Sequence, residues 1–225
     1  WNSGTDWSSG WGNFLGQEGK GRLYFADVNG DGKADLIVHS TDGKIAVRTN
    51  MGDHWNSGTD WSSGWGNFLG QEGKGRLYFA DVNGDGKADL IVHSTDGKIA
   101  VRTNMGTYWN SGTDWSSGWG NFLGQEGKGR LYFADVDGDG KADLIVHSTD
   151  GKIAVRTNMG TYWNSGTDWS SGWGNFLGRP KGELLFGDLN NDGKADLWVH
   201  STDGRVEIRI NNGTRWEIRS ADDWV

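Results

Sequence analysis

The chain has 225 residues, with 39 glycines, one proline and no cysteine, and its formal net charge is −8. The absence of cysteine excludes disulfides and thiolate metal sites, and the acidity argues against nucleic acid as the main partner, because phosphate binding needs a basic face. No apolar run approaches the roughly 20 residues that a membrane helix needs, so membrane insertion is not expected.

A unit of 54 residues recurs along the chain, almost letter for letter. The segment WNSGTDWSSGWGNFLG begins at Trp1, Trp55, Trp109 and Trp163. Self-similarity at such a period indicates a repeat architecture, in which neighbouring units bury the apolar face that one unit cannot bury alone. Binding sites are therefore expected in copies, one per repeat or one per junction between repeats.

Each repeat is expected to contain four strands. In the first complete repeat, RLYFADV at residues 22–28 predicts the first strand, an acidic loop follows, and ADLIVHS at residues 34–40 predicts the second. Thr41-Asp42-Gly43 between two apolar runs predicts a hairpin turn into a third, alternating strand at residues 44–50. The tryptophan-rich segment at residues 55–69 is the expected fourth strand, and nothing has helical length and periodicity.

Four short antiparallel strands per repeat are typical of a β-propeller blade, so we predict an all-β propeller. A linear β array or a β-helix is less favoured, because these recur with shorter repeats and one strand type. The expected organisation is a single repeat domain over residues 1–225. Its expected parts are an N-terminal outer strand at 1–16 and blades at 17–70, 71–124, 125–178 and 179–225.

The two ends of the chain do not match the repeat evenly. There are four sets of the first three strands but five candidates for the fourth, because extra ones stand at residues 1–15 and 216–225. Propellers commonly close by pairing strands from both termini, and the sequence leaves open which end completes the last blade. The last repeat also diverges, with RPKGELLFGDL at residues 179–189, as is expected of a terminal repeat.

Each repeat carries one acidic loop, DVNGDGKAD in its commonest form, with oxygen-bearing side chains at positions 1, 3, 5 and 9 and a lysine carbonyl at position 7. This pattern suits a hard cation with six to eight oxygen ligands, so we predict Ca²⁺ rather than zinc. The loop is not an EF-hand, because valine stands at position 12 where a bidentate glutamate is required. The alternative is a metal-free turn, in which the carboxylates would repel one another in every copy. The predicted ligands are Asp27, Asn29, Asp31, Lys33, Asp35, Asp81, Asn83, Asp85, Lys87, Asp89, Asp135, Asp137, Asp139, Lys141, Asp143, Asp188, Asn190, Asp192, Lys194 and Asp196.

On these residues the chain resembles a known family. FADVNGDGKADLIV resembles the FG-GAP/VCBS repeat, the calcium-loop blade of integrin α-chain propellers and of many secreted microbial proteins. The longer pattern, through DLIVHSTDGKIAVRTN and the Trp/Gly segment, is similar to the Psathyrella velutina lectin family. That resemblance implies a secreted propeller that binds N-acetylglucosamine-type glycans in pockets between adjacent blades. The family's ring has seven blades where this chain has four loops. The repeats must therefore either close as a small four-bladed ring or associate as a homo-oligomer that completes a larger ring, and the resemblance favours the second.

We expect the calcium to be structural rather than sugar-bridging. It would tie the hairpin between the first two strands, as disulfides do in other secreted proteins. Four protein ligands within each loop would leave few coordination positions for a sugar.

The tryptophans recur as Trp-x5-Trp-x3-Trp, with Trp1, Trp7 and Trp11 in the first copy. Blade packing accounts for at least one of the three, because large aromatic side chains suit a glycine-rich blade. Tryptophan among Asn, Ser, Thr and Gly is also typical of carbohydrate sites, where a sugar face stacks on a ring and hydroxyls bond to fixed amides. We predict the sugar contact at the position of Trp11 and Asn13, with Trp7 and its copies as second choices. The predicted ligand-binding residues are Trp11, Asn13, Trp65, Asn67, Trp119, Asn121, Trp173 and Asn175.

One histidine and one arginine also recur in every repeat. The histidines are expected to lie between blades and bond to a hydroxyl or carbonyl rather than a metal, and the arginines to pair with loop carboxylates. They are His39, His93, His147 and His200, and Arg48, Arg102, Arg156 and Arg209.

Catalysis has little support, because every polar group recurs in each repeat and no separate catalytic triad stands out. The predicted function is a calcium-stabilised lectin that gains affinity by multivalency and is not an enzyme. Two alternatives stay open: an integrin-like adhesion propeller, and an engineered symmetric repeat without a biological ligand.

Overall fold

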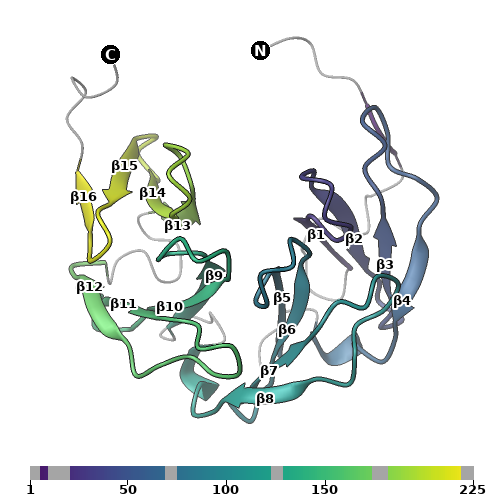
Figure 1. The fold of residues 1–225 in the computed structure, drawn as a ribbon, viewed down its shortest axis with the longest axis horizontal. Helices are drawn as coiled ribbons and strands as arrows, with labels where there is room; N and C mark the ends of the chain where they lie inside the picture. The colour runs from purple at the N-terminus through teal and green to yellow at the C-terminus, as the bar shows by residue number, and fades with distance from the viewer. Residues whose placement is uncertain (1–5, 10–20, 69–74, 123–128, 174–181, 219–225) are drawn as a thin grey trace. The chain divides into compact units, whose positions relative to one another are not determined.

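The structure, a computed structural model, describes residues 6–9, 21–68, 75–122, 129–173 and 182–218. Within these ranges the chain is all-β apart from two short 3₁₀ turns (Figure 1). Neither turn is long or apolar enough to cross a membrane, and no other helix occurs in the part of the chain described.

The strands form four four-stranded antiparallel sheets, and each sheet is a meander in chain order (Figure 1). Blade 1 contains β1 (Arg22–Ala26), β2 (Asp35–His39), β3 (Ile45–Arg48) and β4 (Thr59–Ser62), followed by η2 (Gly66–Phe68). Blade 2 contains β5 (Arg76–Ala80), β6 (Asp89–His93), β7 (Ile99–Arg102) and β8 (Thr113–Ser116), followed by η3 (Gly120–Phe122). Blade 3 contains β9 (Arg130–Ala134), β10 (Asp143–His147), β11 (Ile153–Arg156) and β12 (Thr167–Ser170). Blade 4 contains β13 (Gly182–Gly187), β14 (Asp196–Ser201), β15 (Val206–Asn211) and β16 (Trp216–Ile218).

These sheets have the strand number and order of propeller blades, which confirms the predicted fold class. The predicted hairpin turn is also present: Gly43 has a left-handed backbone (φ 82°) and its N–H donates to the Ser40 carbonyl at 2.9 Å. The predicted blade boundaries all lie outside the described residues, so they stay predictions.

The fourth strand is shorter than the sequence predicted. In blade 1, the expected strand at residues 55–69 is an isolated bridge at Trp55, then β4, then the turn η2. Gly58 and Gly64 adopt positive φ angles of 78° and 88°, which a continuous strand does not contain. The two glycines therefore divide the segment.

The chain divides into two compact units. The first comprises Trp1–Ala80, Asp85–Thr95 and Ile99–Asp114, and the second comprises Asp81–Gly84, Asp96–Lys98 and Trp115–Val225.

The core of each unit is a junction between successive blades. In the first unit, Ile37, Ile45 and Val47 of blade 1 cluster with Leu77, Leu90 and Val92 of blade 2. In the second unit, Ile145, Ile153 and Val155 of blade 3 cluster with Leu184, Leu197 and Val199 of blade 4. One blade therefore buries the face of the next, as the repeat pattern requires.

Two hydrogen bonds recur where one blade meets the next, and we call them the junction hydrogen bonds. In the first unit, the Ala88 N–H donates to the Asp27 carbonyl at 2.7 Å, and Asn104 Nδ2 donates to the Val28 carbonyl at 2.9 Å. In the second unit, the same bonds join Ala142 to Asp81, Asn158 to Val82, Ala195 to Asp135 and Asn211 to Val136. Each junction therefore connects the start of one acidic loop to the end of the next blade's loop and to the end of that blade's third strand.

Candidate metal loops and blade-junction site

The first aspartate of each acidic loop shapes the loop itself. Asp27 accepts from the Gly30 N–H through Oδ1 and from the Gly32 N–H through Oδ2, both at 2.7 Å. Both glycines have φ of 80°, a conformation that lets the chain curl around the carboxylate. The residue predicted as ligand 1 is therefore already held at the centre of the loop.

The aspartate at position 9 is buried at the base of the loop. Asp143 is fully buried and accepts from the Val136 N–H at 2.9 Å and from the Asn158 N–H at 2.7 Å. Burial raises the pKa of Asp143 to about 6, although the two backbone bonds partly oppose this shift. A buried carboxylate of this kind is stabilised in its charged form by a nearby cation.

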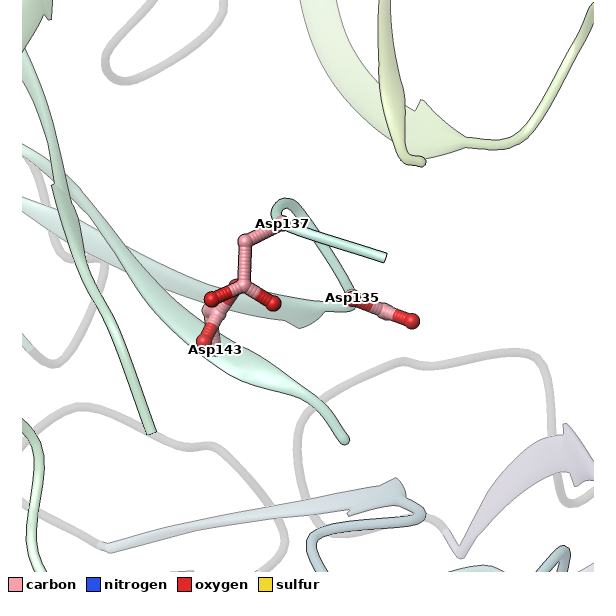
Figure 2. Close-up of side chains that lie close together, drawn as sticks. All are labelled: Asp135, Asp137 and Asp143. Carbon is pink, nitrogen blue, oxygen red and sulfur yellow. The ribbon is translucent and has the colours of Figure 1, made fainter. Parts of the chain in front are cut away.

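Three predicted ligands converge in the loop of blade 3. Figure 2 shows Asp135, Asp137 and Asp143, whose nearest carboxylate oxygens all lie within 4.8 Å of one another. Partial burial raises the pKa of Asp137, and the charges of Asp139 and Asp135 add to this effect. The crowded oxygens fit a hard divalent cation, which would offset their mutual repulsion. The other three loops carry asparagine at the place of Asp137.

Asp139, predicted as ligand 5, lies outside this three-carboxylate group. Its Oδ1 accepts from the Lys141 N–H at 2.9 Å, and its Oδ2 lies 3.3 Å from Lys141 Nζ. The calcium assignment itself stays a prediction.

The predicted sugar-contact tryptophans lie at the junctions but are largely buried. Trp65 is 7% exposed, and its indole N–H donates to Ser62 Oγ at 2.6 Å. The Arg102 guanidinium of the next blade lies over its ring at 4.9 Å, and the Phe68 ring lies 5.3 Å away. Trp119 and Trp173 are buried to the same degree. Little of these rings is accessible for stacking, so their contact with a sugar stays a prediction.

The prediction that the arginines pair with loop carboxylates is wrong for Arg102, Arg156 and Arg209. Arg102 lies over Trp65, and its Nη1 donates to the Asn110 carbonyl at 3.0 Å. It faces Leu90 in the strand register, so its side chain leaves the sheet toward the preceding blade. Arg156 and Arg209 likewise lie over Trp119 and Trp173, at 4.9 and 4.6 Å. The signal in the sequence was the recurrence of one arginine and one tryptophan in every repeat, because residues that recur together can form the same cation–π contact at each junction.

A second class of tryptophan is more exposed. Trp61 is half-buried, and its ring packs against the buried Trp109 of the next blade at 4.9 Å. Trp115 and Trp169 repeat this arrangement with Trp163 and Trp216. These are copies of Trp7, the second choice of the sequence analysis. Of the remaining predicted residues, Trp11, Asn13 and Asn175 lie outside the described residues, as do the side chains of Asn67 and Asn121.

Two of the recurring histidines, His39 and His147, bond to carbonyls, as predicted, but within their own blade. His39 Nε2 lies 2.9 Å from the Trp65 carbonyl, and His147 Nε2 lies 2.9 Å from the Trp173 carbonyl. Both histidines are fully buried, and burial lowers the pKa of His147 to about 4. His200 of blade 4 is exposed instead.

Comparison with known proteins identifies the repeat. The FG-GAP-like repeat profile matches residues 27–92, 81–146 and 135–199, and these matches together span most of the chain. The chain belongs to the FG-GAP-like repeat family. No curated protein sequence matches it significantly.

Solved structures show the same fold at low sequence identity. A lectin from Agrocybe aegerita that specifically recognises non-reducing terminal N-acetylglucosamine matches with 22% identity and a TM-score of 0.67, over 89% of this chain and 52% of the lectin chain. The TcdB2–TccC3–Cdc42 structure matches with 17% identity and a TM-score of 0.51, over 88% of this chain and 9% of that chain. The FG-GAP-like repeat chain thus spans about half the length of the lectin chain. The designed protein Ika4 aligns with a TM-score of 0.38, too low to bear on the origin of the repeat.

Proposed function

We propose that this FG-GAP-like repeat protein is a multivalent carbohydrate-binding propeller for N-acetylglucosamine-type sugars. One observation carries the proposal: the same set of side chains recurs at the junctions between blades. Each set contains a half-buried tryptophan, such as Trp61, and an arginine, such as Arg102, whose guanidinium lies over a second, buried tryptophan. The fold that the chain shares with an N-acetylglucosamine-recognising lectin supports this choice of sugar.

The junction offers both kinds of contact that a sugar needs. Trp61 presents part of an aromatic ring on which the apolar face of a pyranose can stack. Arg102, at the same junction, has five N–H groups, and the bond to the Asn110 carbonyl uses one of them. In this arrangement the buried Trp65 would support the guanidinium and form the wall of the site.

Titration calorimetry with N-acetylglucosamine and its oligomers tests the proposal. Trp115→Ala should remove about one binding site and leave the others, because each junction carries its own copy. Trp163→Phe is the matched control: it alters the buried ring that Trp115 packs on, so it should lower stability without removing a site. No binding heat, together with a blank glycan array, would eliminate the lectin proposal and favour an adhesion propeller that binds protein.

We further propose that each acidic loop holds one structural Ca²⁺. In blade 3, Asp135, Asp137 and Asp143 would hold it, and the cation would compensate charge that the loop otherwise concentrates. Elemental analysis should find calcium in the purified protein, and a chelator should lower the melting temperature. A calcium-free preparation with an unchanged melting curve would contradict this.

The remaining parts of the functional prediction rest on the sequence. An extracellular location is proposed from the resemblance to secreted repeat proteins. The absence of enzymatic activity stays a prediction, and hydrolysis of N-acetylglucosamine oligomers during the titrations would refute it.

A further inference from the structure

A continuous row of hydrogen bonds joins the acidic loops of blades 3 and 4, which lie in the same unit. In blade 3, Asp143 Oδ2 accepts from the Val136 N–H at 2.9 Å. The Val136 carbonyl accepts from Asn211 Nδ2 of blade 4 at 2.8 Å, and the Asn211 N–H donates to Asp196 Oδ1 at 2.8 Å. Three hydrogen bonds, through Val136 and Asn211, therefore connect the position 9 aspartates of two neighbouring loops. We call this row the aspartate relay.

Every member of the relay is shielded from water. Asp143, Val136 and Asp196 are 0% exposed, and Asn211 is 3% exposed. A buried donor or acceptor that loses its partner is not compensated by water, so a movement of one member has to be followed by the next. The position of one aspartate therefore constrains the position of the other.

Two further contacts hold the same loops together. The Ala195 N–H, next to Asp196 in the blade 4 loop, donates at 2.6 Å to the carbonyl of Asp135, which stands at position 1 of the blade 3 loop. A Cβ built at Gly138 would lie 3.3 Å from Lys194 Cγ, so the lysine stem of one loop packs against the glycine of the other. The relay thus connects loops that are also in direct contact.

The first unit contains the same relay between blades 1 and 2. The Val28 N–H donates to Asp35 Oδ2 at 3.0 Å, and the Val28 carbonyl accepts from Asn104 Nδ2 at 2.9 Å. The Asn104 N–H donates to Asp89 Oδ1 at 2.7 Å. The relay therefore belongs to the junction, and it persists in blade 4 although that repeat diverges in sequence.

We propose that the two loops at such a junction bind divalent cations with positive cooperativity, and that Asn211 and Asn104 are the positioning residues that couple them. This inference rests on the proposed binding of one Ca²⁺ by each loop. An ion in the blade 4 loop orders Asp196 and, through the relay, Asp143, so the blade 3 loop loses less conformational entropy when it binds its own ion. By linkage, an ion in the blade 3 loop favours binding to the blade 4 loop by the same factor.

The charges of the loops limit the repulsion between two bound ions. The blade 3 loop carries four carboxylates and one lysine, and the blade 4 loop carries three carboxylates and one lysine. With a dication bound, their formal charges are −1 and 0. Neither occupied loop is then a net positive charge that would oppose binding to its neighbour.

A Ca²⁺ titration followed by NMR reads the two loops separately. Gly140 and Gly193 stand at position 6, and their N–H groups donate to Asp135 Oδ2 at 2.8 Å and to Asp188 Oδ2 at 2.9 Å, so each amide signal reports its own loop. In Asp188→Ala the blade 4 loop should no longer bind Ca²⁺, and the Ca²⁺ concentration that half-saturates Gly140 should rise about fivefold or more. Asp203→Ala is the matched control, because it removes one carboxylate from a blade 4 turn outside the relay. It should leave the Gly140 midpoint unchanged.

Asn211→Ala tests the relay itself. It removes the side-chain bond to Val136 and keeps the backbone N–H that Asp196 accepts. Both loops should still bind Ca²⁺ in this variant, and adding Asp188→Ala should no longer shift the Gly140 midpoint.

The outcomes separate the coupling from the calcium proposal on which it rests. If neither glycine amide responds to Ca²⁺ in the wild-type protein, the calcium proposal fails and the coupling fails with it. If both respond but Asp188→Ala leaves the Gly140 midpoint unchanged, the calcium proposal stands and the cooperativity is overturned. A shift that persists in the Asn211→Ala background would overturn the relay as its route.

Discussion

The junction hydrogen bonds predict a measurable difference between two asparagines at the same place in the repeat. Asn158 is 5% exposed; its Nδ2 donates to the Val82 and Ala142 carbonyls, and its Oδ1 accepts from the Gly160 N–H. Asn50 makes the two equivalent local bonds, but its described contacts include no bond to a preceding blade. The pair of substitutions Asn158→Ala and Asn50→Ala therefore isolates the bond between blades.

The expected magnitudes follow from counting these bonds. At about 1 kcal/mol for each hydrogen bond lost, Asn158→Ala should cost about 3 kcal/mol and Asn50→Ala about 2 kcal/mol. For the bond between blades the cost rises from about 1 to about 1–3 kcal/mol, because the Val82 carbonyl would stay buried without its donor; the difference between the two variants should therefore lie between about 1 and 3 kcal/mol. In a chain of this size each kcal/mol lowers the melting temperature by about 2–4 °C.

Urea denaturation followed by tryptophan fluorescence measures the two free energies of unfolding. Equal losses for the two variants would refute the reasoning, because the bond across the junction would then contribute nothing.

Three further predictions concern buried groups. Burial lowers the pKa of His147 to about 4 from its usual 6.5, so the unfolded state takes up the proton first. Stability should therefore fall as the pH drops from 6.5 to about 4, by about 3 kcal/mol. The advantage of wild type over His147→Gln, measured by denaturation, should shrink over this range, and a constant difference would contradict the assignment. Gly97→Ala should destabilise the protein more than Gly204→Ala in thermal melts. Both glycines have left-handed backbones, in which alanine costs about 1–2 kcal/mol. Only at Gly97 would the new Cβ also lie 2.7 Å from a backbone nitrogen, that of Gly120. Trp109→Ala should lower the free energy of unfolding by about 3–5 kcal/mol, because the Trp109 ring is 5% exposed and packs on Trp61 and Phe79. A loss below about 1 kcal/mol would mean that the neighbouring side chains can repack into the space.

The sequence alone determined the features whose causes are local. The 54-residue period sets the four repeats. The alternation of apolar and polar residues and the Asp-Gly turn set three strands of each blade. The nine-residue acidic loop of blade 3 brings Asp135, Asp137 and Asp143 together. Residues this close along the chain meet whatever the rest of the molecule does.

Tertiary structure decided what each repeated side chain contacts. The sequence assigned Arg102 to a loop carboxylate, but Arg102 lies over Trp65 of the preceding blade. Trp65 is buried, whereas Trp61 is half-buried. Asn104 and Asn50 have the same neighbours in sequence, yet Asn104 reaches the Val28 carbonyl, 76 positions away. Such contacts depend on whether an adjacent blade covers the face, and the nearly identical residues around Asn50 and Asn104 carry no record of that difference.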